Sequence, residues 1–175
     1  MLFQGQYWFY GTHAEKAKKL NAEFDADKHK LLSTAHEIYQ LAAIVGFIYQ
    51  RKADLNKTGG ADYSIFHGEI SRYRDVFQFN YRLIMLLDTE YESDENIRVD
   101  KAFRLIGTDK AKADEELYES YVRGGVDVLY EKLIEPSTSP DDYIKNLYDF
   151  MEDFEDRYGH QDTDKIYDLC QIARS

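Results

Sequence analysis

Two adjacent glycines, Gly124 and Gly125, lie inside a stretch that otherwise has the composition of an amphipathic helix, Tyr121 to Glu135. A glycine in a helix interior costs roughly 1 kcal/mol relative to alanine, so the pair needs a physical reason. The apolar residues before and after the pair keep one helical phase when residues are placed about 100° apart. The pattern therefore predicts one continuous helix and not a break at the glycines.

Gly125 falls at the centre of this apolar stripe, and Gly124 falls at its edge. A glycine at the centre of a core face indicates that another backbone passes close to it. An earlier apolar stretch offers such a backbone, because Ala35, Ala42 and Gly46 are small and share one side of a helix. We predict that the two helices cross near Gly46 and Gly125, and that alanine at Gly124 is neutral or stabilising.

Helix start and stop signals recur along the rest of the chain. They predict helices over about 13–24, 31–51, 65–88, 95–106, 109–135, 140–158 and 164–174. The helix over about 31–51 is apolar on every side in its second half, which places it at the centre of a bundle. Strand patterns are absent, so the sequence predicts an all-α, single-domain helical bundle of about seven helices.

Three of the predicted helix starts depend on capping residues. Thr12 and Ser64 are expected to cap the first and third helices, and Ser139 precedes Pro140 at the start of the sixth. A core stripe of the third helix is expected to begin at Phe66.

The first five residues match the core of a protease recognition site used in expression vectors, so we set 1–5 aside as a cloning remnant and assign 6–175 to the domain.

The net charge of −11 is concentrated in the last part of the chain, where residues 108–175 contain 18 acidic and 8 basic residues. Such a surface repels phosphate backbones, so we expect no direct nucleic-acid binding. The longest apolar run, Leu41 to Tyr49, is half the length that a membrane span needs, so we expect no membrane association. The single cysteine, Cys170, fits a reducing compartment and a cytoplasmic location. The oligomeric state stays open.

Sequence signatures of catalysis are missing. The chain has no HExxH, CxxC, GxGxxG or P-loop stretch, and no Glu-x-x-His pair of the kind found in di-metal bundles. Two Glu-x-x-Glu pairs, Glu116 with Glu119 and Glu152 with Glu155, have the spacing of Mg²⁺ ligands in helical nucleotide pyrophosphatases. To bind a metal together, these four carboxylates would have to converge. We therefore expect no cofactor and no metal, and favour a protein that is not an enzyme.

Carboxylates gather on one side of the predicted sixth helix, opposite its apolar residues. The acidic side comprises Asp142, Asp149, Glu152, Asp153 and Asp156, and the apolar side comprises Tyr143, Ile144, Leu147, Phe150, Met151, Phe154 and Tyr158. Near a helix C-terminus the macrodipole disfavours each exposed carboxylate by about 0.3 to 1 kcal/mol, and a basic partner surface would offset this cost. These five acidic residues are the candidate partner-binding site. A solvated face is one alternative, and pairing with Arg74 and Arg82 of the third helix is another.

The main hypothesis is a non-catalytic, acidic, helical interaction subunit of a larger cytoplasmic assembly in bacteria, bound to another protein that has a basic surface. The 15 tyrosines support it, because tyrosine is enriched at interfaces. An acidic mimic of DNA, as in a defence or antirestriction protein, is the first alternative, and it requires carboxylates at phosphate-like intervals over several turns. A small metal-dependent nucleotide hydrolase is the second alternative.

Overall fold

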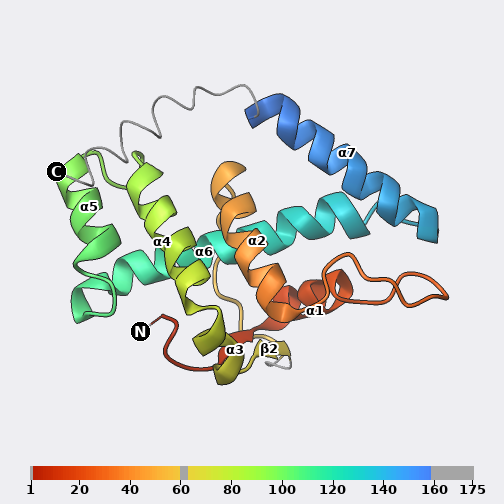
Figure 1. Cartoon of the computed structure of the whole chain (residues 1–175), viewed down its shortest axis with the longest axis horizontal. Coiled ribbons are helices and arrows are strands. Elements are labelled where there is room, and N and C mark those ends of the chain that lie inside the picture. Colours follow the sequence, from red (N-terminus) through yellow and green to blue (C-terminus); the bar gives the residue numbers. More distant parts are fainter. Residues whose placement is uncertain (1, 60–62, 159–175) are drawn as a thin grey trace.

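A computed structural model of the chain describes residues 2–59 and 63–158 (Figure 1). The described residues are mostly helical, which confirms the all-α fold class. The helices are α1 Gly11–Leu20, α2 Ala35–Ile48, α3 His67–Arg72, α4 Arg74–Leu87, α5 Glu95–Phe103, α6 Lys112–Leu129 and α7 Pro140–Tyr158. A short 3-10 helix, η1 Asp109–Ala111, precedes α6, and a π-helical segment, η2 Tyr130–Ile134, continues it. The predicted helix over 164–174 lies outside the described residues.

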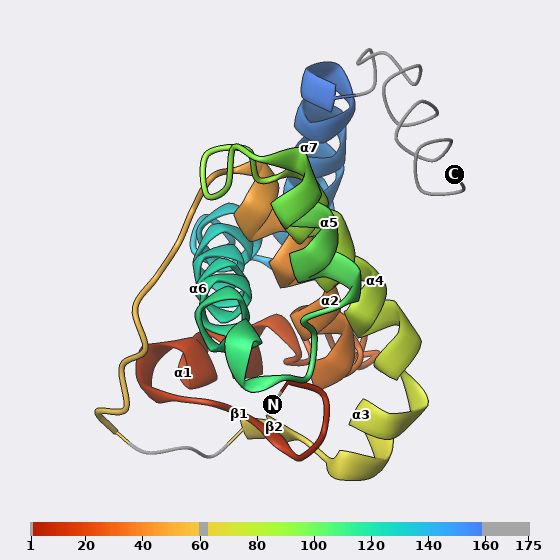
Figure 2. The same cartoon turned by 90° about the vertical axis from the view of Figure 1, so that its left-hand side faces the viewer.

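The crossing of α2 and α6 is at the centre of the fold. Figure 2 looks nearly along α6 and shows α2 between α6 and α4, with the strand pair below them. Helix α4 packs against α2 and α5, whereas α7 packs against η2 at the far end of α6. The helix predicted over 31–51 is thus the central one, but it begins later, at Ala35. Its start is fixed by a capping box in which the Thr34 hydroxyl accepts from Glu37 N and the Glu37 carboxylate accepts from Thr34 N.

A small antiparallel sheet corrects the expectation that the chain has no strands. Strand β1, Tyr7–Phe9, pairs with β2, Tyr63–Ile65, so Ser64 lies opposite Trp8 in the sheet and does not cap a helix. The helix begins instead at His67, where Glu69 accepts from the backbone N–H of Phe66 at 3.3 Å. As a result the Phe66 side chain is 65% exposed and does not start a core stripe.

Two further expectations about the N-terminal half need correction. Helix α1 begins at Gly11 without a side-chain cap, so Thr12 lies inside the first turn and does not cap it. The predicted third helix is divided at Tyr73 into α3 and α4.

Phe3, within the segment set aside as a cloning remnant, is buried and packs against Phe77 and Tyr118 with ring centroids 5.7 and 5.9 Å away. The first residues therefore contribute to the core in this structure.

The glycines of α2 and α6 lie where the two backbones touch. A Cβ atom added to Gly46 would lie 1.9 Å from Tyr121 O, and one added to Gly125 would lie 1.8 Å from Ala42 O. Both separations are far shorter than any van der Waals contact, so only glycine permits this approach. Helix α6 runs unbroken through the pair, as the phase of its apolar stripe predicts.

Gly124 is equally crowded, contrary to the expectation that alanine would fit there. A Cβ atom at Gly124 would lie 1.9 Å from Arg51 O, in the segment that follows α2. This segment runs along α6, where Ala53 N donates to Ser120 O at 3.0 Å. Helical periodicity identifies which residues face a neighbouring helix, but it carries no information about where the loop after that helix goes.

The core contains buried tyrosines, and some of them donate hydrogen bonds to acidic side chains. Tyr39, Tyr81, Tyr118 and Tyr121 are among the largest fully buried side chains, so part of the tyrosine content serves the core and not an interface. Tyr39 donates its hydroxyl to Glu119 Oε1 at 2.7 Å. Burial raises the pKa of Glu119 to about 7, and the Tyr39 hydrogen bond and the charge of Arg123 offset part of that increase.

None of the helices in the described ranges is both long and apolar enough to cross a membrane.

We predict that Gly125→Ala and Gly124→Ala each destabilise the protein by more than about 1 kcal/mol through overpacking against a fixed backbone. Gly68→Ala is the matched control, because Gly68 is also helical and a Cβ atom there would meet nothing within 4 Å. It should be neutral or stabilise by roughly 0.4 to 1 kcal/mol. Urea unfolding measures all three free energies. A Gly125→Ala variant as stable as Gly68→Ala would contradict the close crossing.

We predict that Glu119→Gln gains stability relative to the wild type as the pH rises. The folded-state pKa of about 7 lies above the ordinary value of 4.5, so the contribution of Glu119 is fully present below about pH 4.5 and is lost as the pH rises through 7. Glutamine does not titrate, and the relative gain between pH 5 and pH 8 should be roughly 2 kcal/mol. Urea unfolding at both pH values measures it, with the exposed Glu90→Gln as control. An equal effect of Glu119→Gln at pH 5 and pH 8 would refute the prediction.

Candidate protein-interaction surface on α7

Asp142, one of the candidate residues, accepts the hydrogen bonds that cap the start of helix α7. Asp142 accepts hydrogen bonds at 2.8 Å from Thr138 N, Thr138 Oγ1 and Ser139 N. The backbone bond from Thr138 is the largest of the causes that lower the pKa of Asp142 to about 2. The first candidate carboxylate therefore holds the start of the helix, and its oxygen is already engaged.

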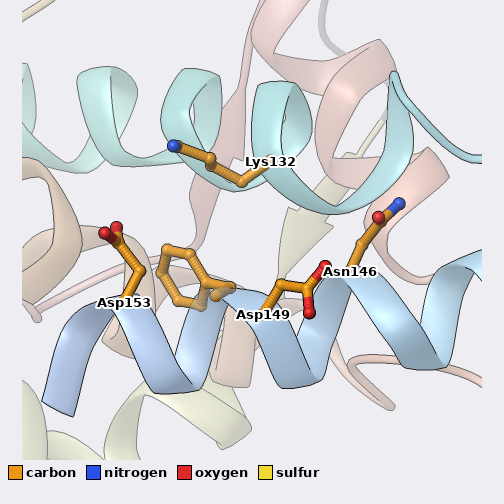
Figure 3. Close-up of a pocket in the computed structure, with 5 residues that line it drawn as sticks. Lys132, Asn146, Asp149 and Asp153 are labelled. Carbon is orange, nitrogen blue, oxygen red and sulfur yellow. The ribbon is translucent and has the colours of Figure 1, made fainter. Parts of the chain in front are cut away.

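A shallow cavity lies between α7 and η2. It has a volume of about 110 Å³ and is lined by Lys132 of η2 and by Asn146, Asp149, Phe150 and Asp153 of α7. Figure 3 shows Asp149 and Asp153 on the same side of α7 as the facing Lys132. Asp153 also accepts a hydrogen bond from Tyr49 OH at 3.2 Å. Asp153 thus contributes to the attachment of α7 to the rest of the domain.

The side of α7 that faces the domain is held by aromatic contacts. Phe150 is buried and stacks on Tyr49 with ring centroids 6.2 Å apart, and Tyr143 stacks on Phe24 at 5.2 Å. These contacts orient the helix so that Glu152 and Asp156 are exposed. Of the five candidate residues, three are exposed and available to contact a partner. These are Asp149, Glu152 and Asp156.

The exposed side of α7 also carries large apolar residues, contrary to the predicted segregation. Ile144, Tyr148 and Met151 are 55%, 65% and 62% exposed and recur at four- and three-residue steps, so they form one row, which we call the α7 stripe. The sequence places Ile144 and Met151 on the apolar side of the helix, and it does not single out Tyr148. The neighbouring η2 and the end of α2 cover only part of the apolar side of α7. The α7 stripe is the apolar part that they leave exposed.

The two Glu-x-x-Glu pairs have different environments. Glu119 lies against Tyr39 in the core, while Glu116 is bound by Arg123, and Glu152 and Glu155 lie on the surface of α7. Among residues 2–59 and 63–158, no group of three or more His, Cys, Asp or Glu side chains is arranged to hold a metal ion. The convergence that the metal-dependent hydrolase requires is therefore not found in this part of the chain.

Arg82 does not adopt the alternative arrangement in which it pairs with the carboxylates of α7. Its guanidinium lies over the ring of Phe103 on α5, 5.5 Å from the centroid. The two helices pack against different parts of the domain, α4 on α2 and α5 and α7 on η2 (Figure 1).

Comparisons with protein-family models, curated proteins and solved structures found no match to this chain.

We predict that Asp142→Ala lowers the melting temperature at neutral pH, because Thr138 and Ser139 lose their acceptor. The folded-state pKa of Asp142 is lowered from 3.8 to about 2, so its stabilising effect is present above about pH 4 and is lost as the pH falls toward 2. The difference from the wild type should therefore shrink between pH 5 and pH 3, as thermal unfolding monitored by circular dichroism would measure. Asp149→Asn on the same helix is the control and should change the melting temperature little. An Asp142→Ala difference that stays constant with pH would contradict this role.

Proposed function

We propose that the protein is a non-catalytic helical interaction subunit of a larger cytoplasmic assembly, and that it binds a protein with a basic surface through the exposed face of α7. The observation that carries the proposal is the composition of this face. Exposed carboxylates of Glu152 and Asp156 lie beside an exposed row of three large apolar side chains. An apolar centre with a charged rim is the usual anatomy of a protein–protein interface.

The energetics of α7 support the same proposal. Four carboxylates, Glu152, Asp153, Glu155 and Asp156, lie in the last two turns, where the helix dipole disfavours negative charge. Exposed apolar rows rimmed by polar residues also mark binding sites on otherwise stable domains. A partner with basic and apolar residues would relieve the charge repulsion and cover the apolar row at once.

The composition of this face favours a protein partner over mimicry of DNA. A DNA mimic needs carboxylates at regular intervals over several turns. The exposed side of α7 instead carries Ile144, Tyr148 and Met151. Apolar side chains of this size do not resemble a phosphate backbone, but they are typical anchors at the centre of a protein interface.

We predict that the triple variant Asp149→Asn, Glu152→Gln, Asp156→Asn loses at least tenfold in affinity for the partner and keeps its fold. The partner would be captured with the tagged protein from its native host, purified, and titrated by calorimetry against wild type and variant. Binding of the wild type should weaken as salt increases, because the pairs at the rim are screened. The substitutions leave out Asp142 and Asp153, which have structural bonds.

A matched control neutralises three exposed carboxylates away from α7, with the substitutions Asp27→Asn, Asp54→Asn and Glu90→Gln. It changes the net charge by the same amount and should bind as the wild type does. Equal affinities for the two triple variants would show that the α7 face is merely solvated, and the proposal would be wrong.

A further inference from the structure

The carboxylate of Glu119 lies where α6, α2 and β1 meet. Tyr39 of α2 donates its hydroxyl to Glu119 Oε1 at 2.7 Å, and the ring of Tyr7 on β1 packs against the Tyr39 ring with centroids 4.5 Å apart. Glu119 is partly exposed as a residue, but its second oxygen, Oε2, is buried and accepts no hydrogen bond from the residues that the structure describes. An ionised carboxylate can accept several hydrogen bonds, so a negative charge here would be poorly satisfied.

The groups that face Glu119 do not supply a countercharge for it. They are Tyr7 of β1, Tyr39 of α2, and Glu116, Tyr118 and Arg123 of α6. Arg123, the cation among them, donates from Nε to Ala53 O at 2.8 Å and from Nη2 to the Glu116 carboxylate. Burial, and then the charge of Glu119, raises the pKa of Tyr7 well above 10, so Tyr7 stays neutral. An ionised Glu119 is therefore more stable in contact with water than in this site.

The segment Gln4–Trp8, which contains the first two residues of β1, is weakly held on the domain. Tyr7 is partly buried, whereas the other four residues of the segment are exposed. Within the described ranges its backbone pairs with β2 alone, and Gln6 Nε2 adds one exposed hydrogen bond to Ser64 Oγ at 2.9 Å. Separation of this segment from α2 thus removes the buried contacts of a single side chain.

The contact between α2 and α6 is much harder to open, because the two backbones touch at Gly46 and Gly125. Figure 2 shows the strand pair below α2 and α6, outside this crossing. Segments with few buried contacts open at a lower free energy than the core of a domain. Water can therefore reach Glu119 at the lowest cost by separation of Gln4–Trp8, with the helix crossing intact.

We propose that the protonation state of Glu119 controls the segment Gln4–Trp8, which packs on α2 while Glu119 is protonated and separates from α2 when Glu119 is ionised. The protein then has two conformations that differ at β1 and share one helical core. The proposal goes beyond the proposed function and does not depend on it, since no residue of α7 takes part.

The direction of the pH dependence follows from burial. Burial raises the pKa of Glu119 to about 7 in the packed state, above its ordinary value of 4.5. The contribution of Glu119 to packing of the segment is therefore fully present below about pH 4.5, and it is lost as the pH rises through 7. Packing should be favoured at pH 5 and separation at pH 8.

Trp8 is the single tryptophan of the chain and lies in this segment, so its fluorescence reports on the segment directly. Trp8 is 37% exposed when the segment is packed, so its acrylamide quenching constant in the full-length protein should rise about twofold between pH 5 and pH 8 as the segment separates. Hydrogen exchange followed by mass spectrometry at both pH values should show that α2 and α6 stay protected. Loss of protection in α2 and α6 together with the segment would indicate global unfolding and would overturn the proposal.

The decisive variant is Glu119→Gln, which removes the titrating group and leaves every histidine in place. Its quenching constant should be the same at pH 5 and pH 8 and equal to that of the wild type at pH 5. Glu90→Gln, at an exposed carboxylate, is the matched control and should behave as the wild type does. Glu119→Leu replaces Glu119→Gln if the latter does not give the wild-type circular dichroism spectrum. A wild type whose quenching is independent of pH would refute the proposal, as would a neutral variant with the same pH response as the wild type.

Discussion

The structure depends on the backbone-to-backbone contact between α2 and α6. With Gly46 against Tyr121 O and Gly125 against Ala42 O, the two helices approach more closely than any side chain would allow. This approach fixes α2 between α6 and α4, and Gly124 lets the segment after α2 lie directly on α6. The free-energy cost of glycine in a helix is offset by the extensive contact that it permits.

The parts of the fold that the sequence predicts are those encoded locally. The apolar stripe keeps its phase across Gly124 and Gly125, so a continuous α6 follows from periodicity alone. The start of α7 follows from Ser139, Pro140 and Asp142. The pairing of β1 with β2 joins residues more than fifty positions apart, and three residues per strand carry too little pattern to identify it. Thr12 and Ser64 have the right composition for caps, but tertiary contacts decide where those helices begin.

The sequence predicts the candidate surface only in part, because tertiary contacts decide which side chains stay exposed. Helical spacing places carboxylates on one side of α7, but it does not say how much of the apolar arc a neighbour covers. Ile144 and Met151 are exposed because Phe150 and Tyr143 make the contacts with the domain. Spacing also does not distinguish Glu119, which burial makes a weak acid among tyrosines, from Glu152 on the surface. The acidic composition therefore has two physical roles, and only the surroundings of each residue separate them.

The π-helical segment η2 sets the direction in which the acidic helix faces. Glu135 N donates to Tyr130 O at 3.0 Å, a bond across five residues, so this turn holds one residue more than an α-helical turn. If the same residues adopted α-helical geometry, everything that follows would rotate by about 100° around the axis of α6. The outer face of α7 would then point in another direction with every one of its side chains unchanged. The wide turn therefore sets the direction of this face, and loss of one residue in η2 together with a return to α-helical geometry would leave that direction nearly unchanged.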